Sequence, residues 1–100
     1  MRRTSYKGKY KLSKHEFYVA YHAALCPDNQ IISDAIIECV KEAGEDIFIW
    51  LFEAVTHENV TYTTLRMRDN PIPCGKNQYY EKRRKFYYLL FKRIMGIHGA

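Results

Sequence analysis

Apolar residues recur at intervals of three and four along most of this chain, which is the spacing of one face of an α-helix. The clearest run consists of Ile32, Ala35, Ile36, Cys39, Val40 and Ala43. A second run, which also falls on one stripe, consists of Ile47, Trp50, Leu51, Ala54 and Val55. The pattern predicts an all-α fold, a compact bundle of about five helices with a long C-terminal helix.

Capping residues predict where the first helices begin and end. Ser13 is followed three residues later by Glu16, which is a capping box, so a helix is expected from residue 14 to about 25. The second helix is expected over roughly 29–43, because Gly44 is a suitable C-terminal stop. A third helix is expected over about 46–57.

The last forty residues have the pattern of a helix-turn-helix. Thr61 is a suitable N-cap for a short helix over about 62–69. Pro71 and Pro73 cannot continue that helix, and a long helix rich in Lys, Arg and Tyr begins at Lys76. This order predicts a unit that delivers a basic helix to a phosphate backbone.

Four residues carry specific expectations about the core. Trp50 and Phe86 should be among the least exposed side chains, and Ile72 should fill the apolar space under the proline turn. Arg83 falls inside the apolar stripe of the last helix, where an unpaired charge would be costly. Its guanidinium is therefore expected to reach a carboxylate or the C-terminus of a helix.

Charge is strongly segregated along the chain, although its net value is only +5. Residues 1–15 carry a net charge of +6, residues 16–60 carry −8 and residues 61–100 carry +7. A protein that docks on a polyanion gains free energy from counterion release for each phosphate that it neutralises. The segregation favours a nucleic acid as the partner.

The length and composition fit one domain without disulfide or metal staples. We expect a basic flexible arm over residues 1–12 and a single helical domain over 13–100, with the helix-turn-helix at about 61–95. Three cysteines without a CxxC spacing indicate a reducing compartment. No apolar run approaches the roughly 18 residues that span a bilayer, so no membrane is expected as a partner.

Catalysis has little support in the sequence. His22 and Cys26 stand four residues apart, a spacing at which two helical side chains can share a metal, but no second pair completes a site. The chain has no glycine-rich phosphate loop, and its serines lack a base with an orienting partner. We expect no enzymatic activity, no metal and no cofactor.

Three stretches of the chain resemble a known family, and these are YKGKYKL at 6–12, HEFYVAYH at 15–22, and PCGK at 73–76 followed by YY at 79–80, RR at 83–84 and FYYLL at 86–90. Together they look like the small phage-encoded transcriptional regulators of the ArpU/RinA type, found in prophages of Gram-positive bacteria. That family is similar to region four of sigma factors, whose helix-turn-helix binds promoter DNA. The resemblance implies phage or prophage genes as targets and the cytoplasm of the bacterial host as the location.

The residues predicted to bind DNA gather on the last helix and in the basic arm. Asn77 and Gln78 carry amides that can bond an adenine edge in the major groove, and the N-terminus of their helix suits a phosphate. Lys76 and Lys82 are expected to hold the DNA backbone. The full predicted set is Lys76, Asn77, Gln78, Glu81, Lys82, Arg84, Lys85, Arg66, Arg2, Arg3, Lys7 and Lys9.

Three functions stay open at this point. The first is a sequence-specific regulator that binds double-stranded DNA, with RNA polymerase or a second copy of the chain as further partners. The second is a small phage protein that binds and modulates a host protein, either RNA polymerase or a defence nuclease. The third is an RNA-binding module, suggested by the Tyr and Lys interleaving of the arm and by Tyr80 and Tyr88 as stacking platforms.

Overall fold

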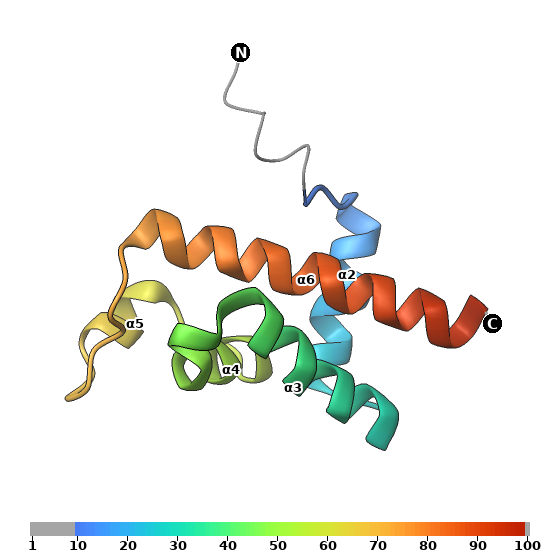
Figure 1. Ribbon diagram of the computed structural model, residues 1–100, viewed down its shortest axis with the longest axis horizontal. Coiled ribbons are helices and arrows are strands. Elements are labelled where there is room, and N and C mark those ends of the chain that lie inside the picture. The colour runs from blue at the N-terminus through green and yellow to red at the C-terminus, as the bar shows by residue number, and fades with distance from the viewer. Residues whose placement is uncertain (1–9, 100) are drawn as a thin grey trace, which may run out of the picture.

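Helix α6 (Lys76–Gly99) is the longest element and runs across the whole molecule in Figure 1. The computed structural model describes residues 10–99, and side chains for residues 10–96. The elements before α6 are α2 (Lys14–Leu25), α3 (Gln30–Gly44), the 3₁₀ helix η1 (Glu45–Ile47), α4 (Phe48–Thr56) and α5 (Tyr62–Arg66). The described residues contain helices and no strand, which confirms the predicted all-α class.

Three helices begin where side-chain caps place them. Ser13 and Glu16 form the predicted capping box, with the Glu16 carboxylate 2.8 Å from the Ser13 backbone nitrogen. Asn29 caps α3, so this helix starts one residue later than the predicted range. The Thr61 hydroxyl accepts the N–H of Thr64 at 3.2 Å, which confirms the predicted cap of α5.

Gly44 ends α3, as predicted, but without the left-handed backbone of a usual glycine stop. Its φ is −163°, which any residue can adopt. A Cβ at this position would lie 3.1 Å from the side chain of Ile47 and 3.1 Å from that of Lys82. Glycine therefore permits the close approach of α6. The chain continues through η1, so the single helix predicted over about 46–57 is split into η1 and α4.

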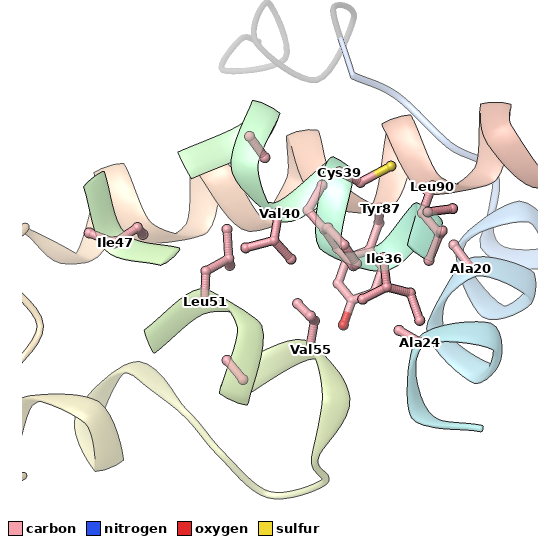
Figure 2. Packing of buried hydrophobic residues seen from close by; sticks show 14 of the residues in the cluster. Ala20, Ala24, Ile36, Cys39, Val40, Ile47, Leu51, Val55, Tyr87 and Leu90 are labelled. Carbon is pink, nitrogen blue, oxygen red and sulfur yellow. The ribbon is translucent and has the colours of Figure 1, made fainter. Parts of the chain in front are cut away.

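The core is built where α2, α3 and α4 meet the inner side of α6 (Figure 2). Phe86 is fully buried, as predicted, together with Tyr87 and Leu90. Trp50 is only half-buried, so the expectation that it is among the least exposed residues is wrong. Its indole N–H donates to the carbonyl of Asn70 at 2.8 Å. An indole needs such a partner, and this one lies at the edge of the core.

The turn between α5 and α6 is held by three specific hydrogen bonds. Ile72 is fully buried beneath it, as predicted, and its N–H donates to the Leu65 carbonyl at 3.3 Å. Arg66 donates to the Ile72 carbonyl at 3.2 Å, and the Tyr62 hydroxyl donates to the carbonyl of Cys74 at 2.8 Å. Helix α5 ends at Arg66, three residues before the predicted end of its range, because these contacts already belong to the turn.

A bidentate ion pair joins the same turn to α4. Arg68 donates to both carboxylate oxygens of Glu53, at 2.9 and 2.7 Å. The arginine lowers the pKa of Glu53 below its ordinary value, mainly through this hydrogen bond. The path from α5 into α6 is thus fastened to α4 at Glu53 and at Trp50.

Two expectations about individual segments need correction. Arg83 reaches neither a carboxylate nor a helix end. Its guanidinium carbon lies 5.0 Å from the centre of the Tyr87 ring, so a ring face, and not an anion, meets its charge. Part of the segment predicted as a flexible arm also packs, because Tyr10 lies 5.6 Å from the ring of Tyr88 and Leu12 lies against the core. The rest of the arm, residues 1–9, lies outside the described residues.

Candidate nucleic-acid interface

The first two turns of α6 present four of the predicted site residues to solvent. Lys76, Asn77, Gln78 and Glu81 are all exposed. The N–H of Gly75 lies 3.4 Å from the Gln78 amide oxygen, which is longer than an ordinary hydrogen bond. The first N–H groups of a helix have no partner within the helix, and the helix dipole adds positive charge there. This end of α6 therefore combines two amides with a terminus that favours anions.

Arg84 and Lys85 extend the same side of α6 by another turn. Asn77, Glu81, Arg84 and Tyr88 are spaced by four, three and four residues, so they project from one side of the helix. Arg84 and Lys85 are both half-buried. These five positions, with Lys76 and Gln78, form the surface that we call the α6 face.

Several hollows border the α6 face, and two of them share residues. The first, which we call the polar hollow, measures about 530 Å³ and is lined by Asn77, Tyr80, Glu81 and Arg84. The second, which we call the aromatic cleft, measures about 310 Å³ and is lined by Tyr10, Lys11, Leu12, Phe17, Tyr80, Arg83, Arg84 and Tyr87. Because Tyr80 and Arg84 belong to both, the two hollows adjoin.

Other cations of α6 meet the acidic helices. Lys82 Nζ lies 3.4 Å from a carboxylate oxygen of Asp46 in η1, and Arg93 donates to Glu38 of α3 at 2.6 Å. Lys82 and Arg93 thus lie on the side of the helix that is partly neutralised. Lys82 was predicted to hold a DNA backbone, and the structure places it against Asp46, at the edge of the α6 face, where it lines a further hollow with Gln78 and Lys85.

The remaining predicted residues fall into two groups. Arg66 donates a hydrogen bond to the carbonyl of Ile72 and so helps to hold the turn. Arg2, Arg3, Lys7 and Lys9 lie outside the described residues.

The aromatic cleft contains residues that the sequence analysis did not select. Leu12 precedes the N-cap Ser13 and Phe17 is the fourth residue of α2, which are the two positions of a hydrophobic staple. Both line the cleft, and both pack against the core. The staple pattern was therefore a local indication that residues 10–12 are held near α2. That α6 closes the cleft could not be derived from it.

Burial suppresses the reactivity of several ionisable groups. Burial raises the pKa of the Cys39 thiol to about 11 and that of the Tyr79 hydroxyl to about 12. Burial also raises the pKa of Cys74. These groups stay protonated near neutral pH and are poor nucleophiles there. Among the described residues, no group of three or more His, Cys, Asp or Glu side chains is placed to hold a metal ion.

Comparison of the chain with protein-family models, with curated proteins and with solved structures gave no match. Within the part of the chain that the structure describes, no helix has both the length and the apolar character needed to cross a membrane.

Proposed function

We propose that the protein binds double-stranded DNA through the α6 face and regulates transcription. One observation carries the proposal: two cations of α6 pair with carboxylates, and three others accompany exposed amides. Lys82 and Arg93 meet carboxylates of η1 and α3, whereas Lys76, Arg84 and Lys85 lie in the same first three turns of α6 as the amides of Asn77 and Gln78. A surface with both cations and amides suits a ligand that is a polyanion with readable base edges.

The side chains of the α6 face have the chemistry of major-groove recognition. The major groove is about 12 Å wide and admits an α-helix. Asn77 and Gln78 lie near the N-terminal end of α6, where side chains of a recognition helix reach base edges. Lys76 and Lys85 are suited to phosphates, and Arg84 to either a phosphate or a guanine. In this proposal, α5 and α6 with the turn between them act as the helix-turn-helix.

The acidic charges support a defined orientation on DNA. Asp34, Glu38 and Glu42 are exposed on α3, and Glu45 and Asp46 follow them in η1. A duplex docked on the α6 face gains from cations there and would be repelled if it approached along α3. Single modules of this size usually need a second copy or a protein partner to bind DNA tightly. We therefore include in the proposal that the protein binds DNA as a homodimer or together with RNA polymerase.

A salt series on two duplexes tests this function. The resemblance to phage regulators suggests a duplex from a phage intergenic region as the specific probe, with a scrambled duplex of equal length as the control. We expect a plot of log K against log salt to have a slope of about −3 to −5, as for three to five neutralised phosphates. Removal of residues 1–9, which contain Arg2, Arg3, Lys7 and Lys9, should flatten that slope by more than one unit.

Two matched lysine variants test whether DNA binds to the α6 face or to any positively charged part of the protein. Lys85→Ala should weaken both duplexes and lower the slope by about one unit. Lys41→Ala removes an exposed lysine of α3 and should leave binding unchanged. Salt-independent or absent binding by a folded protein would contradict the proposal and favour a protein as the partner. Stronger binding to single-stranded RNA than to either duplex would favour the RNA-binding alternative.

A further inference from the structure

The aromatic cleft has an unusual combination of walls for its size. Its volume of about 310 Å³ lies at the lower end of the roughly 300–1,000 Å³ of small-molecule sites. Among the described residues, its side chains are a leucine, three cations and four aromatic rings, without a carboxylate. The rings belong to Tyr10, Phe17, Tyr80 and Tyr87. The chemistry calls for a ligand that is both aromatic and anionic.

Two of the cations that line the cleft form no ion pair with a carboxylate among the described residues. Arg83 lies over the Tyr87 ring and forms no ion pair with a carboxylate among the described residues. Lys11 is exposed and likewise has no ion pair within the described part of the chain. Arg83 and Lys11 therefore leave the cleft with a net positive charge that a phosphate would neutralise.

The adjoining polar hollow narrows the choice among aromatic anions. It shares Tyr80 and Arg84 with the cleft and adds the Asn77 amide and the Glu81 carboxylate. An amide and a carboxylate can both hydrogen-bond the edge of a nucleobase, whereas a simple phenyl phosphate has no such edge. Tyr80, which lines both hollows, is placed to serve as a stacking surface.

We propose that the aromatic cleft binds one nucleotide unit, with the base against Tyr80 and the phosphate near Lys11 and Arg83. The bases of a duplex are stacked and paired, so this ligand is not the intact duplex of the proposed function. It is either a free nucleotide or an unpaired nucleotide of a strand. Both sources present the same chemistry, and the experiment distinguishes them.

The test titrates the full chain with adenosine 5′-monophosphate and, separately, with a short oligothymidine, while amide NMR spectra follow residues 10–17 and 80–87. Saturable shifts in both segments with the mononucleotide indicate a free-nucleotide site. Saturable shifts only with the oligonucleotide indicate a site for an unpaired strand. Either result supports the proposal, and no saturable shift with either ligand overturns it.

Paired variants test the assigned roles. Tyr80→Ala should weaken binding at least fivefold, whereas Tyr18→Ala, which removes an exposed tyrosine of α2 outside the cleft, should change it less than twofold. Lys11→Glu should weaken binding by a similar factor without disturbing a helix, and Lys41→Glu should not. Lys11→Glu keeps the test decisive if Tyr80→Ala unfolds the domain.

Two further probes test the class of ligand. Pyrophosphate and phenyl phosphate should each bind at least tenfold more weakly than the nucleotide, because one lacks a ring and the other lacks a base edge. Equal affinity for pyrophosphate would reduce the cleft to a general anion site and overturn the proposal. Equal affinity for phenyl phosphate would overturn the assignment of a nucleotide.

Discussion

The two long sides of α6 carry the same types of residue and differ in what surrounds them. On the side toward α3, Lys82 and Arg93 pair with Asp46 and Glu38. On the α6 face, Arg84 borders the polar hollow and the aromatic cleft, and Lys85 forms no ion pair with a carboxylate among the described residues. A cation therefore cannot be assigned to binding or to folding from its identity alone, because the elements that pack beside it decide its role.

Among the changes considered, a substitution on the inner side of α6 should have the largest effect, and it should lower the stability of the fold. Phe86 is fully buried between the helices, so Phe86→Ala should lower the free energy of unfolding by about 3–5 kcal/mol. Asn77→Ala, on the exposed face, should change it by less than about 0.5 kcal/mol. Urea unfolding followed by circular dichroism measures both values. Similar losses for the two variants would mean that the sides of α6 are misassigned.

The amides of the α6 face should read sequence. Asn77→Ala and Gln78→Ala should each cost about 1–3 kcal/mol of binding free energy on the specific duplex and little on a scrambled one. Fluorescence anisotropy with both duplexes measures this difference. An equal loss on the two duplexes would show that the amides contact only the backbone.

Substitution of Lys85 and of Lys82 compares the α6 face with the side of α6 toward α3 in DNA binding. Lys85→Ala should weaken the binding of any duplex, because a phosphate contact carries no sequence information. Lys82→Ala should have a smaller effect on binding, because Lys82 already faces Asp46. Anisotropy across a salt series reports both. A larger loss for Lys82 than for Lys85 would reverse the assignment of the two sides.

A smaller effect is expected from the hydroxyl of Tyr87. The side chain is buried, and its hydroxyl makes no hydrogen bond of ordinary geometry among the described residues, although the Arg83 guanidinium lies close enough to act on its pKa. Burial also raises the pKa of this hydroxyl. Tyr87→Phe removes a desolvated polar group and keeps the ring, so stability should stay equal or rise by up to about 1 kcal/mol. A marked fall in the thermal midpoint would reveal a partner for this hydroxyl.

The smallest effect concerns the ion pair of Glu53 with Arg68. The pKa of Glu53 is lowered in the fold, so its contribution is present above the ordinary pKa of 4.5 and is lost as pH falls through the lowered value. Glu53→Gln should therefore be slightly less stable than the parent at neutral pH and equally stable in strong acid. Thermal unfolding across a pH series measures this. Because both side chains are partly exposed to solvent, the difference at neutral pH should be small.

Local sequence predicted the helix boundaries better than it predicted the edges of the core. The caps at Ser13 and Thr61 depend on residues within one turn, so their helices begin where expected. Trp50 and Arg83 were misjudged because helical spacing gives the direction of a side chain but not its neighbours. Trp50 meets a carbonyl of the turn and Arg83 meets a ring, and both partners depend on packing and chain path.

For the candidate site too, the sequence predicted the local features but not the long-range contacts. The polar side of α6, with Asn77 and Gln78, follows from helical spacing. The pairing of Lys82 with Asp46 joins residues 36 positions apart, and the aromatic cleft joins residues 10–17 to residues 80–87. No pattern within a helix contains such long-range contacts, so only the three-dimensional structure divides the cations by role.

Chemical-shift mapping with duplex DNA tests the central claim most directly. Amide NMR spectra of the full chain are recorded while the specific duplex is added, and the shifted residues are placed on the structure. The account predicts that the strongest shifts fall on residues 76–85, with little change on residues 34–46 of the acidic helices. Strong shifts on residues 34–46 without shifts on residues 76–85, or no shifts at all, would contradict the account.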